Sequence, residues 1–179
     1  NKSGQILSKI DSLSKQLIVL LAATSALGPA GMQILLPALP VIQDDFSVSN
    51  DVAQLTLSLS MFSIAIGTLV YGPMSDKYGR KPTMLLGIFI AIIGSIFCYL
   101  ADSIGWLIAG RIIQAFGGAV GLVLARAIVR DVYGAEESAR VIATLVMVMV
   151  IAPMMSPALG GEMMNRFGWE SVFLVIAGA

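Results

Sequence analysis

The spacing of the charged residues constrains the fold of this chain more than any other feature. Four blocks of 20 to 28 residues contain no Asp, Glu, Lys or Arg; they follow Lys15, Asp51, Lys81 and Arg140. A helix needs about 20 mostly apolar residues to cross the hydrocarbon core of a bilayer. Each block is therefore long enough to be a membrane-spanning helix.

The composition agrees with a membrane protein and excludes several classes of function. Of the 179 residues, 57% are hydrophobic and 12% are charged, against about 25% charged in an ordinary soluble domain. The chain has no histidine and one cysteine, Cys98, so we expect no histidine-based catalysis, no metal site and no cofactor. Its 11 basic and 11 acidic residues are balanced, which is unlike a nucleic-acid-binding protein. A transmembrane β-barrel is disfavoured because apolar runs such as 85–93 lack strand alternation.

We predict an all-α polytopic membrane protein with five complete spans and the start of a sixth. The expected spans cover residues 16–42, 52–74, 83–101, 104–129, 138–164 and 170–179. The last stretch is too short to cross a bilayer, and the chain begins with Asn1. We therefore interpret residues 1–179 as the N-terminal part of a longer protein. The first span is too long for a cleaved signal peptide.

The distribution of lysine and arginine predicts the orientation in the membrane. Eight basic residues fall on one side of the expected spans: Lys2, Lys9, Lys15, Lys77, Arg80, Lys81, Arg130 and Arg140. The other side has only Arg166. Since basic loops remain in the cytoplasm, we expect a cytoplasmic N-terminus in a bacterial inner membrane.

The loop between the second and third spans carries the most specific motif. Its pattern is G-x-x-x-D-[RK]-x-G-[RK]-[RK], formed by Gly72, Asp76, Lys77, Gly79, Arg80 and Lys81. Gly79 can adopt a positive φ in a tight turn, and Pro82 suits the first turn of the next helix.

This motif resembles the signature loop of the major facilitator superfamily. The resemblance implies the N-terminal six-helix half of a 12-span transporter, whose missing C-terminal half would be its partner. It also implies that the loop is a conformational latch between the two halves. The expected cytoplasmic latch residues are Gly72, Asp76, Lys77, Gly79, Arg80, Lys81, Arg126 and Arg130.

The fourth span contains a costly charge, Arg111. An arginine inside the membrane costs about 2.5–3.5 kcal/mol on insertion scales. Either its side chain snorkels to the outer surface, or it shares a cavity with Gln114, which lies on the same helix face. The segment is similar to the superfamily motif R-x-x-Q-G-x-G, whose arginine serves substrate binding or proton transfer. Gly117 and Gly121 recur every fourth position and predict close helix packing.

The fifth span contains the prolines and glycines of a partial antiporter motif: Pro153, Pro157, Gly160 and Gly161. Interior prolines remove backbone hydrogen bonds and kink a helix. The span is also rich in methionine, and Met149 is a candidate for an adaptable substrate surface.

The ending L-P-A-L-P of the first span and the motif R-A-I-V-R-D narrow the resemblance to the bicyclomycin/chloramphenicol-resistance branch of drug:proton antiporters. Members of that branch commonly carry an aspartate where this chain has Gln33, which cannot titrate. Proton coupling must then use Glu162, a carboxylate in the missing half, or no proton at all.

The sequence therefore predicts a secondary transporter and not an enzyme. We expect proton-coupled efflux of drugs or small amphipathic compounds, with Gln33, Arg111, Gln114 and Met149 in the substrate or proton pathway. One alternative is an importer of a metabolite or organic anion, because an arginine-lined cavity suits anions. Another is a structural or sensory membrane module that transports nothing.

Overall fold

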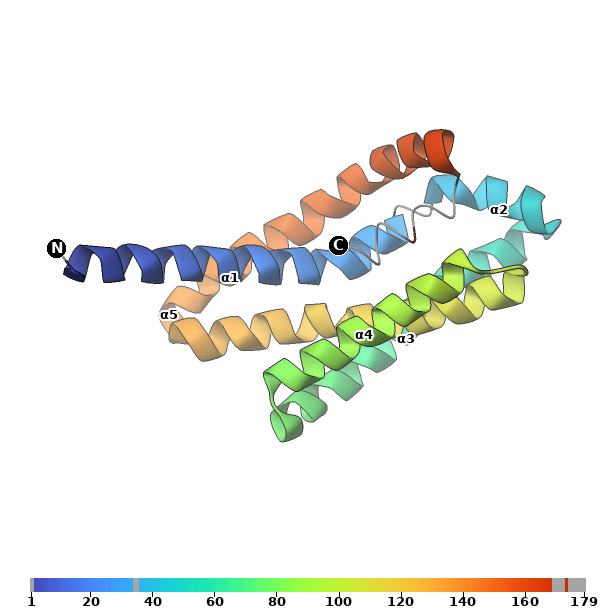
Figure 1. Cartoon of the computed structure of the whole chain (residues 1–179). Coiled ribbons are helices and arrows are strands. Elements are labelled where there is room, and N and C mark those ends of the chain that lie inside the picture. Colours follow the sequence, from blue (N-terminus) through green and yellow to red (C-terminus); the bar gives the residue numbers. More distant parts are fainter. Residues whose placement is uncertain (1, 34–35, 169–172, 174–179) are drawn as a thin grey trace.

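The computed structural model describes residues 2–33, 36–168 and 173. Its elements are α1 (Lys2–Gln33), a 3₁₀ turn η1 (Leu36–Ala38), α2 (Leu39–Phe46), α3 (Asn50–Tyr78), α4 (Arg80–Tyr99) and α5 (Ile104–Phe167). Figure 1 shows that α5 turns back partway along its length, so that its first arm and its second arm run in roughly opposite directions. A helical bundle is the expected outcome, because a helix satisfies its own backbone hydrogen bonds in lipid.

Five helical segments of the described chain are long and apolar enough to cross a membrane. They are Gln16–Phe46, Asn50–Tyr78, Arg80–Tyr99, and the two arms of α5, Ile104–Tyr133 and Glu137–Leu159. This confirms the predicted fold class, an all-α polytopic protein with five spans. The predicted start of a sixth span at 170–179 lies outside the described residues, apart from the buried Phe173.

Two boundaries differ from the sequence-based expectation. The helix that contains the first span begins at Lys2, so the basic tail before residue 16 is also helical. The segment expected between the first two spans is shorter, because α2 extends beyond residue 42 to Phe46 and is followed by Ser47, whose φ is 51°. Helical structure thus continues past the limits of the apolar blocks that were used to place the spans.

The first arm of α5 forms the centre of the bundle. Half of the most apolar stretch of Ile104–Tyr133 is buried inside the protein, whereas 11% of the corresponding stretch of Glu137–Leu159 is buried. It contributes residues to all three hydrophobic clusters: Leu107 to one, Ala125 and Val129 to the second, and Ala119, Val120 and Leu124 to the third. The fourth span is therefore the helix around which α1, α3 and α4 are packed.

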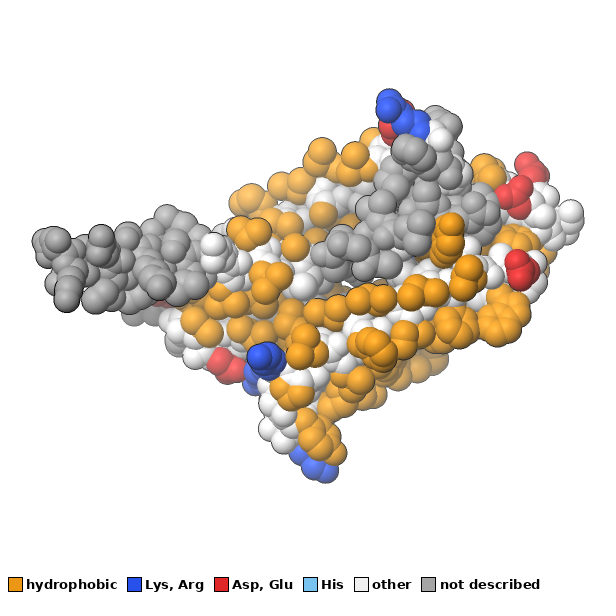
Figure 2. All heavy atoms as spheres, viewed as in Figure 1, with side chains coloured by type: hydrophobic (Ala, Val, Ile, Leu, Met, Phe, Trp, Pro, Cys, Tyr) orange, Lys and Arg blue, Asp and Glu red, His pale blue; other side chains and the backbone are white. Residues whose placement is uncertain are grey.

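The outer surface has the character of a protein in a bilayer. Figure 2 shows hydrophobic side chains along the length of the bundle and charged side chains near its ends. Large apolar side chains such as Leu69, Phe62 and Met154 are 66–77% exposed. Such a surface is stable only when it faces lipid or another apolar partner.

A single residue, Gly79, joins α3 to α4. Its φ is 93° and its ψ is 158°, and its N–H donates a hydrogen bond to the Ser75 carbonyl at 3.0 Å. The positive φ predicted for this glycine is confirmed. This part of backbone space is essentially restricted to glycine and costs other residues about 1–3 kcal/mol.

We therefore expect Gly79→Ala to destabilise the protein by about 1–3 kcal/mol. The reason is backbone strain and not crowding, since the nearest atom to an added Cβ would be Pro82 Cδ at 3.7 Å. The midpoint of thermal unfolding in detergent would measure the effect. Gly72→Ala is the matched control, because nothing lies within 4 Å of its added Cβ. Equal melting temperatures for the two variants would contradict the strained turn.

Candidate functional site

Arg111 belongs to a buried hydrogen-bonded network between α5 and α4. Its Nη1 donates to Gln114 Oε1 at 2.6 Å, and Gln114 Nε2 donates to Ser95 Oγ at 2.7 Å. Ser95 Oγ in turn donates to the Ala91 carbonyl at 2.9 Å. Arg111 is 2% exposed and Gln114 is 5% exposed. The arginine therefore lies inside the bundle and does not snorkel to the outer surface.

Glycines allow the helices to approach closely enough for this network to form. A Cβ added at Gly94 of α4 would collide with the backbone of Gln114. A Cβ added at Gly117 would collide with the backbone of Ala91, and one at Gly121 with the Thr24 carbonyl of α1. The close packing predicted for the glycines of the fourth span is thus confirmed. Small residues serve the same purpose in membrane helix interfaces generally.

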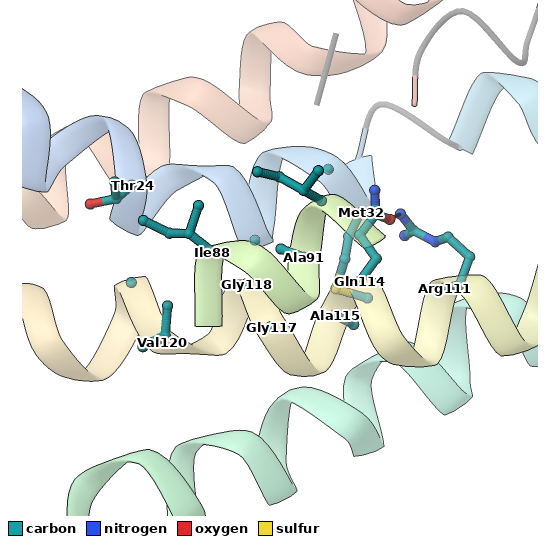
Figure 3. A pocket seen from close by; sticks show the side chains of 14 residues that line it. Thr24, Met32, Ile88, Ala91, Arg111, Gln114, Ala115, Gly117, Gly118 and Val120 are labelled. Carbon is teal, nitrogen blue, oxygen red and sulfur yellow. Dashed lines mark hydrogen bonds between the residues drawn. The ribbon is translucent and has the colours of Figure 1, made fainter. Parts of the chain in front are cut away.

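Arg111 and Gln114 also line a cavity of about 80 Å³ between α1, α4 and α5. Figure 3 shows both side chains at one end of the lining, while Thr24, glycines and apolar side chains form the rest. The lining residues are Thr24, Gly28, Gly31, Met32, Ile88, Ala91, Ile92, Arg111, Gln114, Ala115, Gly117, Gly118, Val120 and Gly121. Pockets for whole drug-sized ligands measure roughly 300–1,000 Å³, so this cavity has room for one functional group of such a ligand.

Gln33 lies elsewhere. Its side chain is exposed and lines a second, more open hollow of about 350 Å³ together with Leu57, Met61 and Pro153. Met32 lines both hollows. The structure thus brings Arg111 and Gln114 together in one cavity, whereas Gln33 lines a different hollow.

The fifth-span candidates follow the second arm of α5. Met149 and Pro157 are half-buried, and Pro153 contributes to the hollow that Gln33 lines. The helix continues through both prolines and through Gly160 and Gly161. Ser156, beside Pro157, donates a hydrogen bond to the Ala152 carbonyl at 2.7 Å.

A second polar cluster lies at the end of the bundle where α3 meets α4. Arg80 Nη1 donates to Asp76 Oδ1 at 2.7 Å and to Ser75 Oγ at 2.5 Å, while its Nε donates to Asp131 Oδ2 at 3.0 Å. One guanidinium therefore connects the end of α3, the start of α4 and the first arm of α5. These partly exposed contacts link three helices at one end of the bundle.

Of the expected latch residues, the structure brings together Asp76 and Arg80. Lys77, Gly79, Lys81, Arg126 and Arg130 are exposed, and Gly72 is half-buried. The partner that α5 supplies to Arg80 is Asp131, which follows Arg130 directly.

Ser95, Asp131 and Phe173 were not singled out from the sequence as site residues. The Phe173 ring centroid lies 5.9 Å from Arg111 Cζ. Asp131 could have been found, because it ends the R-A-I-V-R-D motif. Glu162, the candidate proton carrier, is exposed and paired with Arg166 at 2.6 Å. The part of the chain that the structure describes holds no cluster of three metal-ligating side chains.

Comparison with known proteins agrees with this architecture. The family model of the Major Facilitator Superfamily matches residues 21–179. The chain is 37% identical over 162 residues to the uncharacterized MFS-type transporter YdgK of Bacillus subtilis, which covers 89% of this chain and 40% of that protein. It is 34% identical over 160 residues to the bicyclomycin resistance protein homolog of Haemophilus influenzae, again 89% of this chain and 40% of the relative.

A third relative is the multidrug resistance protein MdtL of Shigella flexneri, which is 35% identical over 149 residues. That match covers 83% of this chain and 38% of the relative. The chain thus spans about two fifths of the length of the curated relatives that it matches. The family match over residues 21–179, together with the five spans, shows that this chain belongs to the major facilitator superfamily.

Proposed function

We propose that the chain is the N-terminal half of a proton-coupled exporter of drugs or small amphipathic compounds, of the bicyclomycin/chloramphenicol-resistance type. The observation that carries this proposal is the buried network of Arg111, Gln114 and Ser95 at the end of a cavity between three helices. A buried charge inside a membrane protein is costly and is usually retained for function. The names of two relatives, a bicyclomycin resistance homolog and a multidrug resistance protein, support export of drugs.

In this proposal the protein lies in a bacterial inner membrane with its N-terminus in the cytoplasm. The Arg80 cluster then lies at the cytoplasmic side, where it holds α3, α4 and α5 in one arrangement. The C-terminal half would complete the cavity near the middle of the bilayer, and the two halves would rock against each other during transport. Asp76, Arg80 and Asp131 would form and break contacts during this movement.

The proposal is tested by expressing the complete protein that contains this chain in bacteria that lack their main efflux pumps. Accumulation of ethidium, chloramphenicol and an aromatic carboxylate is measured with and without a protonophore. We expect lower accumulation of at least one compound, and we expect the protonophore to abolish the difference. Cells that express the Arg111→Ala variant should accumulate the compounds as cells without the protein do. Cells that express Arg140→Gln, which changes an exposed residue, should behave like cells with the wild-type protein.

Other results would contradict the proposal. Higher accumulation than in control cells would indicate an importer. Equal accumulation of every compound, with the protein present in the membrane, would indicate a module that transports nothing. Export that persists with the protonophore would exclude proton coupling.

A further inference from the structure

Ser95 is a buried serine of α4 whose hydroxyl takes part in two hydrogen bonds. It donates to the Ala91 carbonyl at 2.9 Å and accepts from Gln114 Nε2 at 2.7 Å. A hydroxyl has one hydrogen, so once that hydrogen points to Ala91, the oxygen can only accept. The end of the Gln114 amide that faces Ser95 must therefore be the NH₂ group. The other end, Oε1, then faces Arg111, whose guanidinium can only donate.

The packing of α4 against α5 does not depend on this hydrogen bond. Glycines bring the two helices together on either side of Ser95 along α4. A Cβ added at Gly87 of α4 would collide with the Val120 side chain. A Cβ added at Gly110 of α5 would lie 2.8 Å from Cys98 Sγ and 2.9 Å from its backbone nitrogen. Since these contacts hold the helices together, the Ser95 hydroxyl is available to position a side chain.

Ser95 reaches the site through Gln114 and does not border the cavity itself. It is 1% exposed, and it is not among the described residues that line the cavity, whereas Arg111 and Gln114 are. Figure 3 shows these two side chains next to each other at one end of the cavity. A flexible side chain at the wall of a cavity can turn into it unless hydrogen bonds hold it in place. Ser95 holds the NH₂ end of the Gln114 amide.

We propose that Ser95 is a positioning residue of the substrate site. It fixes the amide of Gln114, and through this amide the guanidinium of Arg111, without touching the substrate. This inference rests on the proposed transport function and adds to it a residue that lies outside the cavity. Loss of the hydroxyl leaves Gln114 Nε2 without its acceptor, so the amide turns toward the cavity and the guanidinium loses its fixed acceptor. The affinity for substrate then falls although the helices remain packed.

The test compares Ser95→Ala with Ser60→Ala in the complete protein in lipid nanodiscs. Ser60 is the matched control, because it is also buried and donates to a carbonyl of its own helix, that of Thr56, but has no side-chain partner among the described residues. Binding of radiolabelled chloramphenicol is measured by scintillation proximity and binding of ethidium by fluorescence, both without a proton gradient. We expect Ser95→Ala to raise the Kd about tenfold, as the loss of one hydrogen bond would, and Ser60→Ala to change it by about twofold at most.

A double-mutant cycle with Gln114→Met separates positioning from a general role in packing. Methionine is similar to glutamine in length but has no amide, so Ser95 has nothing left to position. In the Gln114→Met protein, Ser95→Ala should therefore raise the Kd by about twofold at most. If the two residues acted independently, the full tenfold effect would be seen again in this background.

Two results would overturn the inference: a Kd for Ser95→Ala equal to that for Ser60→Ala, or the same loss of affinity from Ser95→Ala in the wild-type and Gln114→Met proteins. The second result would mean that Ser95 acts by packing α4 against α5. Failure of the proposed function gives a different result. The expected cycle without gradient-dependent export would contradict the transport proposal alone, whereas export with a Kd that Ser95→Ala leaves unchanged would contradict only the role of Ser95.

Discussion

Replacing Gly94 with valine is expected to leave little folded protein in membrane extracts. A Cβ at this position of α4 would collide with Gln114 N and would lie 2.5 Å from Gln114 Cα and 2.8 Å from its Cβ. These are mainly backbone atoms, so no change of rotamer can relieve the collision. Overpacking of a well-packed core costs about 1–3 kcal/mol and sometimes more, and valine adds two further methyl groups. Size-exclusion chromatography of a fluorescent fusion protein would measure the folded fraction.

The smaller substitution Gly94→Ala tests the same helix contact with less disruption of the fold. We expect α4 to move away from α5, which lengthens the hydrogen bond between Ser95 and Gln114 and lowers the melting temperature. Gly105→Ala is the control, because nothing lies within 4 Å of its added Cβ. A Gly94→Val protein that elutes and melts like wild type would show that α4 and α5 do not make this contact.

The number of spans and their approximate positions could be predicted from the sequence, because lipid imposes one simple requirement on length and polarity. The positions at which the helices end could not be predicted in this way. Lipid does not determine where a helix stops in water, so the helix before residue 16 and the extension of α2 to Phe46 were missed. Gly79 was predicted correctly because its conformation depends on local backbone geometry.

The candidate site shows the same division between local and long-range information. Arg111 and Gln114 are three residues apart on one helix, so their spacing predicts that they can meet. Ser95 lies 19 residues from Gln114, and its contact depends on how far α4 rotates and how closely it approaches. Asp131 is 51 residues from Arg80, and their contact likewise depends on how the helices pack against each other. Where Gln33 lies relative to Arg111 depends on the rotation of α1 against α5, which no local pattern specifies.

The combined substitution Arg111→Met and Gln114→Leu is expected to abolish substrate binding and export but to stabilise the folded protein. The substitution removes a buried charge from the membrane interior, where an arginine costs about 2.5–3.5 kcal/mol. Ser95 keeps its hydrogen bond to the Ala91 carbonyl, so the change creates no unpaired hydroxyl. A stabilisation of about 1–3 kcal/mol is expected, as when apolar residues replace other buried polar groups.

The melting temperatures of the single variants show whether the network serves function or stability. Arg111→Met alone leaves Gln114 Oε1 without its donor, which costs about 1–3 kcal/mol, so this variant should melt below the double variant. Arg140→Met removes an exposed charge and should change the melting temperature little. Melting temperatures in lipid nanodiscs, with gradient-dependent export measured in parallel, provide the comparison. If the double variant instead unfolds more easily than wild type, the network is needed to hold α4 against α5. A double variant that still exports its substrate would show that Arg111 does not contact the substrate, because the cavity would then function without its charge.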